Sequence, residues 1–264
     1  MKKEIFCDRV MLTFASHVAE VTLKRAREHN GLDWAMIDGL LAAQQRLTEL
    51  DGLRAVVLAG EGKSFCAGLD MAAIMTQPKR LPSLLAADER GINPVQRLAL
   101  GWRDAGVPVI AALHGHVYGG GLQIALGADI RVAHPDASLA LLEIVWGIIP
   151  DMAISVTASD IRSDVLRELA WTGRKLDGAE GLALGIVTRL ADDPQEIART
   201  IAASVAARSP KAVAAARELF TLAPGLPQRE RLALEARLQG GLLGGEEQME
   251  AVAARMEGRE PHFP

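Results

Sequence analysis

The sequence of 264 residues contains only two cysteines, Cys7 and Cys66, and they stand far apart. Two distant cysteines form neither a disulfide framework nor a cysteine-based metal site. No set of histidine, aspartate and glutamate residues has the spacing of metal ligands either. The sequence therefore predicts a protein without a metal ion, in which Cys66 is a small apolar packing residue.

Neither basic nor acidic residues dominate the chain. Lysine and arginine number 29 and aspartate and glutamate 33, which gives a net charge of −4 and an isoelectric point of about 5.9. This balance offers no electrostatic footprint for nucleic acid. No apolar run approaches the ~18 residues of a membrane span, and Asp8 and Arg9 interrupt the apolar stretch near the N-terminus. We expect a cytoplasmic protein that binds neither nucleic acid nor a membrane.

Common nucleotide-binding and hydrolase motifs are also missing. The glycine-rich stretch HGHVYGGGLQIALGADIR (114–131) lacks the spacing G-x-G-x-x-G, and no Walker lysine accompanies it. No serine lies in a G-x-S-x-G sequence. Glycine allows a positive φ and a close approach to backbone N–H groups near a helix start. The remaining ligand for this loop is the oxygen of a reacting carbonyl.

What the chain does contain is a pattern of alternating strands and helices. Hydrophobic residues make up 49% of it, enough for one large core. Alternation over 4–14 and 17–25 predicts short strands of a meander, with turns near Asp8 and Ser16. Apolar runs at 54–58 and 108–113 each lead into a glycine-containing loop and a helical pattern, which is typical of a parallel sheet with helical crossovers. Residues 71–92 have weak periodicity and are interpreted as a mobile flap. Helices, the first capped by Asp33, are expected at 33–50, 164–170, 178–184, 194–208, 211–222, 229–238 and 246–257.

A second loop, GEGKSFCAGLD (60–70), also follows a strand and opens toward a helix. Two such loops can each direct one backbone N–H group at the same oxygen, which makes an oxyanion hole. Together, FCAGLD, YGGGLQIALGADIR, LLEIVWGIIPD and WTGRKLDGAEGLALGIV resemble the motifs of the crotonase, or enoyl-CoA hydratase/isomerase, family. The resemblance covers about residues 3–260.

The resemblance implies an α/β protein with the crotonase (ClpP/crotonase-like) fold of repeated ββα units. A crotonase core domain would span residues 1–200 and a C-terminal helical region residues 201–264. The substrate would be an acyl-CoA thioester, with coenzyme A as part of the substrate and no other cofactor. The family also implies a homotrimer or a dimer of trimers.

Carried over to this sequence, the resemblance places the oxyanion hole at the N–H groups of Leu69 and Gly120. A thioester enolate carries its charge on the carbonyl oxygen, and losing one preorganised donor to such an oxygen costs on the order of 10²-fold in rate. Arg25 follows the third strand, where the resemblance implies that coenzyme A passes, and solvated surface charge is the competing interpretation. The expected substrate-binding residues are Arg25, Ala67, Gly68, Asp70, Gly119 and Gly121.

The acid–base residues depart from the family's hydratases, which carry two glutamates. Glu143 matches the second of these, and its apolar neighbours should raise its pKa by desolvation. A strand-end glutamate or a helix cap is the alternative interpretation of Glu143. Gln123 stands at the position of the first glutamate, and a carboxamide can hold a water but cannot take its proton.

Asp151 is the third candidate catalytic residue. The family's dienoyl-CoA isomerases look similar in placing an aspartate there, although they also carry an acidic residue at the position of Gln123. An aspartate directly after Pro150 is also a routine helix cap or first-turn residue. Proton transfer and capping both remain open for Asp151.

One carboxylate suffices for isomerisation, because the same group can remove a proton and return it elsewhere. Hydration instead needs a base for the water and an acid for Cα. The expected function is therefore enoyl-CoA double-bond isomerisation with Glu143 as acid and base. The alternatives are hydration by a water that Gln123 positions, and a non-catalytic acyl-CoA-binding or scaffolding protein.

Overall fold

The computed structural model describes residues 2–264, and its chain begins with an antiparallel meander. The three strands are β1 (Lys2–Phe6), β2 (Val10–Ala15) and β3 (Val18–Leu23). Ser16 and His17 both have positive φ, 48° and 65°, the backbone of a two-residue hairpin turn that suits the twist of the strands. The turns predicted near Asp8 and Ser16 are confirmed.

From β3 onward the sheet is parallel. The added strands are β4 (Ala55–Gly60), β5 (Val109–Leu113), β7 (Ile130–Ala133) and β9 (Arg189–Leu190), in the order β1-β2-β3-β4-β5-β7-β9. Every residue of β4 and β5 is buried, which explains why their sequences are unbroken apolar runs. A second sheet pairs β6 (His116–Tyr118) with β8 (Ser138–Ala140), also in parallel.

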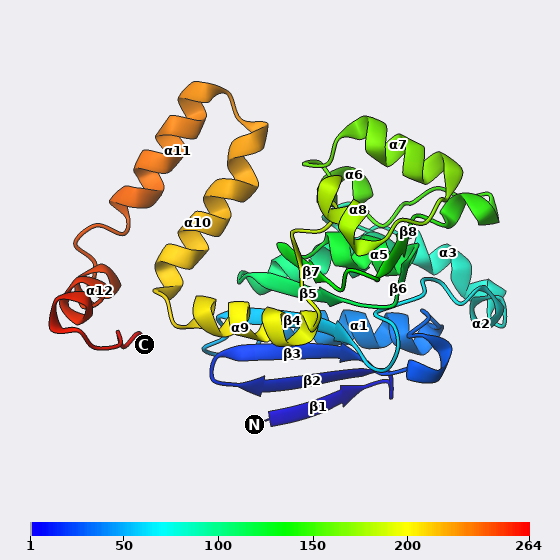
Figure 1. The fold of residues 1–264 in the computed structure, drawn as a ribbon, viewed down its shortest axis with the longest axis horizontal. Coiled ribbons are helices and arrows are strands. Elements are labelled where there is room, and N and C mark those ends of the chain that lie inside the picture. The colour runs from blue at the N-terminus through cyan, green and yellow to red at the C-terminus, as the bar shows by residue number, and fades with distance from the viewer. Residues whose placement is uncertain (1) are drawn as a thin grey trace.

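Helices cover both faces of the large sheet (Figure 1). On one face, α1 (Trp34–Leu47) packs with Val56 and Leu58 of β4 in the larger core cluster. On the other face, α9 (Pro194–Ala206) packs Ala198 and Ala202 against the alternate side chains of β4 and β5. The predicted parallel sheet with helical crossovers is confirmed, and so is the Asp33 cap, which accepts a hydrogen bond from Met36 N at 2.7 Å.

The remaining helices connect and flank these layers. The sequence located the helices predicted between residues 164 and 257 to within a few residues, including the short one at 178–184, and it predicted a helical pattern after the glycine loop. It missed most of the other short helices. The remaining helices are η1 (Ala26–Glu28), α2 (Met71–Ile74), η2 (Pro78–Arg80), α3 (Leu81–Leu84), α4 (Pro94–Leu100), η3 (Gly101–Ala105), α5 (Gly120–Leu126), η4 (Glu143–Trp146), α6 (Ile154–Thr157), α7 (Ser163–Thr172), α8 (Gly178–Ala183), α10 (Pro210–Leu222), η5 (Ala223–Gly225), α11 (Gln228–Gly240) and α12 (Glu246–Glu257).

The segment 71–92 contains α2, η2 and α3 and is fastened to α1. The Arg80 guanidinium lies 4.2 Å from the centre of the Trp34 ring and pairs with Asp38 at 2.9 Å. Trp34 Nε1 also donates to the Ile74 carbonyl at 3.1 Å. The mobility expected of this segment stays a prediction.

The C-terminal region leaves the core after α9 and returns to it. Helices α10 and α11 form a hairpin that projects from the sheet, and the chain end lies back near α9 (Figure 1). Arg54 holds that end, because its guanidinium donates to the carbonyls of Phe263 at 2.8 Å and Ala206 at 3.1 Å. The expected division between residues 200 and 201 stays a prediction, and it would cut through α9, whose Ala198 and Ala202 belong to the core. Among residues 2–264, no helix is both long and apolar enough to cross a bilayer.

Candidate functional site

The glycine triplet lies where β6 ends and α5 begins, and each glycine meets a different neighbour. Gly119 has φ +50° and ψ −121°, and a Cβ there would lie 3.3 Å from Glu143 Oε1. A Cβ on Gly121 would lie 2.4 Å from the carbonyl oxygen of Cys66. Because these glycines have no Cβ, the start of α5 can lie close to Glu143 and to the loop of Cys66.

Leu69 is held by a short parallel bridge to Leu32. Leu32 N donates to Gly68 O at 2.8 Å, and Asp70 N donates to Leu32 O at 3.2 Å. Leu32 therefore bonds to the carbonyl of Gly68 and to the N–H of Asp70, the residues before and after Leu69. Because such groups alternate in direction along an extended strand, the N–H of Leu69 points away from Leu32. Gly68 has φ +88°, and a Cβ there would lie 3.5 Å from Gly120 N. In the described chain, the N–H groups of Leu69 and Gly120 donate to no other residue.

Glu143 opens η4 and is only 8% exposed. Its Oε1 accepts a hydrogen bond from Gln123 Nε2 at 2.5 Å, whereas its Oε2 is buried without a partner among residues 2–264. Burial raises the pKa of Glu143, and the negative charge of Asp151 raises it further against the opposing hydrogen bond from Gln123. A carboxyl group in this state can exchange a proton through Oε2. Its burial also means that the alternative of an exposed strand-end glutamate is wrong.

Gln123 is buried on α5, and both ends of its amide are engaged. Its Oε1 accepts a hydrogen bond from Met152 N at 2.8 Å while its Nε2 donates to Glu143. The amide therefore joins Glu143 to the backbone next to Asp151. The water-holding role expected of Gln123 stays a prediction, and sequence reasoning missed its bond to Glu143 because nothing local marks a contact between residues 20 positions apart.

Asp151 is partly exposed, and within residues 2–264 it caps no helix. The nearest helix, α6, begins at Ile154, and its N-cap is Ala153 in a left-handed conformation with no side-chain cap bond. The capping interpretation of Asp151 is therefore wrong. Partial burial raises the pKa of Asp151, and this carboxylate is close enough to Glu143 to affect its pKa. The pKa values of both carboxylates are therefore raised, chiefly by burial in each case.

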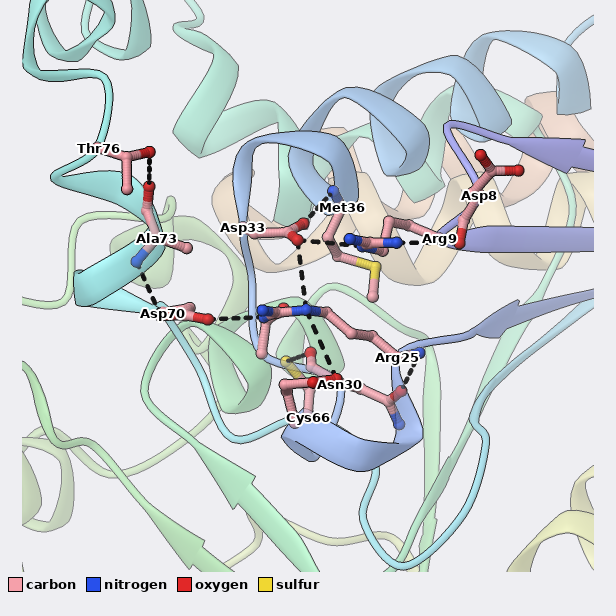
Figure 2. A network of polar contacts seen from close by, with 12 residues as sticks. Asp8, Arg9, Arg25, Asn30, Asp33, Met36, Cys66, Asp70, Ala73 and Thr76 are labelled. Carbon is pink, nitrogen blue, oxygen red and sulfur yellow. Dashed lines mark hydrogen bonds and ion pairs between the residues drawn. The ribbon is translucent and has the colours of Figure 1, made fainter.

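Several of the expected substrate-binding residues are glycines close to the two N–H groups, whereas Arg25 is engaged with other side chains. Gly68, Gly119 and Gly121 line the approach of the two loops. The Arg25 guanidinium, however, is occupied by carboxylates: it donates to Asp70 at 2.7 Å and lies 3.3 Å from Asp33 (Figure 2). The structure gives Arg25 protein partners, and contact of Arg25 with substrate stays a prediction.

Cys66, possible metal ligands and exposed apolar side chains complete the description of the site. Cys66 is fully buried, and desolvation raises the pKa of its thiol to about 12, as suits a packing residue. Across residues 2–264, no group of three or more histidine, cysteine, aspartate and glutamate side chains could hold a metal ion. Large apolar side chains are exposed at Leu69 and, directly after Glu143 in the sequence, at Ile144, Val145, Trp146, Ile148 and Ile149.

Comparison with known proteins identifies the family. The model of the enoyl-CoA hydratase/isomerase family matches residues 13–264. The chain belongs to this family. It is 32% identical over 238 residues to a Bacillus subtilis (strain 168) protein named "Probable enoyl-CoA hydratase", covering 89% of this chain and 90% of that relative. It is 28% identical to the peroxisomal Delta(3,5)-Delta(2,4)-dienoyl-CoA isomerase of Arabidopsis thaliana, covering 94% of this chain and 93% of the isomerase.

The fold comparison agrees with the family. The crystal structure of an enoyl-CoA hydratase from Polaromonas sp. JS666 matches with a TM-score of 0.85 and 25% identity, covering 97% of this chain and 99% of that one. The predicted crotonase fold and the predicted enzyme of the enoyl-CoA hydratase/isomerase family, acting on an acyl-CoA, are confirmed. Relatives are named both as hydratases and as an isomerase, so family membership does not select the reaction.

Proposed function

We propose that this enzyme moves a double bond along an enoyl-CoA, with Glu143 as the acid and base. The observation that carries the proposal is the buried Oε2 of Glu143, beside the glycine loop of Gly120; within residues 2–264 neither Oε2 nor the Gly120 N–H has a hydrogen-bond partner. Oε2 removes a proton from the carbon next to the thioester, and the electron pair moves to the carbonyl oxygen. The same oxygen returns the proton two carbons further along, so one carboxylate completes the reaction.

The N–H groups of Leu69 and Gly120 are proposed to bind the thioester oxygen. Each lacks a partner in the part of the chain that the structure describes, and a Cβ on Gly68, the residue before Leu69, would lie 3.5 Å from Gly120 N. Negative charge grows on the thioester oxygen as the proton leaves, and preorganised donors stabilise it without reorganisation. The proposed reaction uses no metal ion and no separate cofactor; coenzyme A takes part only as a portion of the substrate.

Hydration is the second candidate, favoured by the carboxylate of Asp151. Hydration requires one group to take a proton from water and another to protonate Cα. Glu143 and Asp151 are two carboxylates of raised pKa, and the charge of Asp151 acts on Glu143. Gln123 would contribute by holding Glu143, since its Oε1 and one N–H of its Nε2 are occupied.

A substrate panel separates the two reactions. We expect wild-type protein to convert 3-enoyl- or 3,5-dienoyl-CoA faster than it hydrates a short 2-enoyl-CoA. Glu143→Gln should reduce every activity by about 10²- to 10⁴-fold, because the acid and base are lost. Glu257→Gln on α12, which removes an exposed carboxylate paired with Arg259, should leave turnover unchanged and serves as the control.

Three results would each contradict one part of this proposal: the reaction, the role of Glu143, or the expectation that Gln123→Glu raises hydration. Efficient hydration of 2-enoyl-CoA, with 3-enoyl- and dienoyl-CoA untouched, would make hydration the function. Full turnover in Glu143→Gln would remove Glu143 from the mechanism. If Gln123→Glu fails to raise hydration, lack of a second glutamate is not what limits that reaction.

We also propose that the chain assembles as a homotrimer or a dimer of trimers. The C-terminal helices leave large apolar side chains exposed, including Phe220 at 78% and Met256 at 83%. A groove of about 660 Å³ lies between α10 and α11 and is lined largely by alanine and leucine. Contiguous apolar surface of this kind is typical of protein interfaces.

A further inference from the structure

Arg25 connects the two backbone segments that meet next to Leu69. Its Nη1 donates to Asp70 Oδ2 at 2.7 Å and to Gly31 O at 3.1 Å. Gly31 precedes Leu32, and Asp70 follows Leu69, so this one nitrogen spans the bridge between Leu32 and Leu69. The guanidinium lies at the centre of the polar network in Figure 2.

Asp70 is fixed through both of its carboxylate oxygens. Oδ1 accepts a hydrogen bond from Ala73 N at 3.0 Å and so caps α2, while Oδ2 faces Arg25. The hydrogen bonds from Ala73 and Arg25 lower the pKa of Asp70, so the carboxylate stays charged at neutral pH. A second contact, between the Arg25 Nε and Asp33 Oδ2 at 3.3 Å, fixes the guanidinium to the cap of α1.

The ion pair is largely shielded from water, since the side chains of Arg25 and Asp70 are 14% and 24% exposed. Shielded pairs with good geometry restrain their surroundings more than surface pairs do. The restraint acts on the residue next to Leu69, whose N–H has no partner within the described residues.

We propose that Arg25 and Asp70 are positioning residues that fix the direction of the Leu69 N–H toward the thioester oxygen. This inference rests on the proposed function. It assigns Arg25 and Asp70 to the alignment of the donor and not to contact with coenzyme A. Alignment matters because displacing a reacting or binding group by about 1 Å can cost about 10²-fold in rate.

Steady-state kinetics distinguishes the possible roles of Arg25. For Arg25→Met we expect kcat to fall by about 10- to 100-fold with KM within about 3-fold of wild type, because the donor is misaligned mainly for the charged transition state. Arg25→Lys should recover part of the loss, since an ammonium can still pair with Asp70. A raised KM with unchanged kcat would instead indicate contact with substrate, and would overturn the proposal.

Asp70→Asn tests the same pair without removing the cap. Asparagine caps helices about as well as aspartate, so α2 keeps its start while the charge is lost. We expect a similar fall in kcat, and little further loss in the double variant Arg25→Met/Asp70→Asn, because both changes break one interaction. Additive losses would overturn the proposal. If Arg25→Met does not fold, Asp70→Asn carries the test alone.

Arg9→Met provides the matched control. Arg9 also pairs with Asp33, at 3.0 Å, but touches neither Asp70 nor Gly31. Losing this pair should lower the unfolding temperature at most slightly and leave kcat within about 2-fold. A fall in kcat equal to that of Arg25→Met would mean that the whole network acts only through stability, and would overturn the proposal.

The carbonyl stretch of bound substrate analogue gives a direct measure of alignment. Butanoyl-CoA labelled with ¹³C at its carbonyl has no double bond to react, and hydrogen bonds from Leu69 and Gly120 should lower its infrared frequency. We expect this shift to shrink in Arg25→Met and to persist in Glu143→Gln. Equal shifts in wild type and Arg25→Met would refute the positioning role, whereas no shift in the wild-type protein would refute the oxyanion hole of the proposed function.

Discussion

At the scale of single residues, the pKa of Glu143 is set by influences of different kinds. The buried surroundings disfavour its charge, Asp151 adds a nearby negative charge, and Gln123 donates a hydrogen bond that favours ionisation. The first two raise the pKa of Glu143, and the third opposes them. A raised pKa brings a carboxylate closer to the neutral range in which it both takes and returns a proton.

The pH dependence of kcat/KM tests this arrangement. Glu143 must be ionised to remove a proton, so kcat/KM should fall as pH drops through its raised pKa. Asp151→Asn removes a charge that raises this pKa, and we expect the acidic limb of the remaining activity to move to lower pH. Because burial is the larger cause, the limb should stay above the ordinary glutamate range.

Asp51→Asn, in an exposed turn, should leave the limb in place and is the control. An acidic limb that stays fixed or moves upward in Asp151→Asn would show that the charge of Asp151 does not act on the group that limits activity.

At the scale of elements, helix α5 carries three parts of the site. It presents the Gly120 N–H, contains Gln123, and begins beside Glu143 because its N-cap, Gly119, has no side chain in the way. Its close approach to the Cys66 loop depends on Gly121, since any Cβ there would overlap the Cys66 carbonyl. The same short helix therefore packs against the Cys66 loop and holds Gly120 and Gln123 in place for the proposed reaction.

Gly121→Ala should damage both stability and activity. A methyl group 2.4 Å from Cys66 O must push α5 away, and overpacking of this kind costs about 1–3 kcal/mol. We expect the unfolding temperature to fall by several degrees, at about 2–4 °C per kcal/mol, with a larger loss of turnover. Thermal unfolding followed by circular dichroism, together with a turnover assay, measures both.

Gly240→Ala is the matched control, because a Cβ at Gly240 in α11 meets nothing within 4 Å. Alanine there should be neutral or slightly stabilising. If Gly121→Ala behaves in the same way as Gly240→Ala, the packing argument for α5 is incorrect.

At the scale of the whole molecule, the C-terminal region is anchored at its base and apolar at its outer surface. Arg54 ties the chain end to the core, while the α10 and α11 hairpin projects away from the sheet (Figure 1). Helix α9 belongs to the core, and the region after it exposes Phe220, Leu222, Leu232, Leu243, Met249 and Met256.

We expect multi-angle light scattering at micromolar concentration to give a mass about three or six times the 28.2 kDa of one chain. The mass should persist at high salt, because burial of apolar surface is not screened by ions. A mass near 28.2 kDa would rule out the trimer, and dissociation by salt would rule out an apolar interface.

The sequence alone determined most of what depends on neighbouring residues along the chain. Periodicity located the long helices, and turn residues located the meander, because helix and strand patterns repeat over a few positions. The glycine spacing excluded a phosphate loop, and the ordered motifs indicated the family that the comparison confirmed.

Only the tertiary structure decided which side chains meet. It joined Arg25 to Asp70 across 45 positions and Gln123 to Glu143 across 20, and it removed Asp151 from any helix cap. It also left Glu143 Oε2 buried with no hydrogen-bond partner among the described residues. Local patterns could not reveal these facts, because a hydrogen bond between distant segments depends on how the layers pack, and that packing is set by the whole core at once.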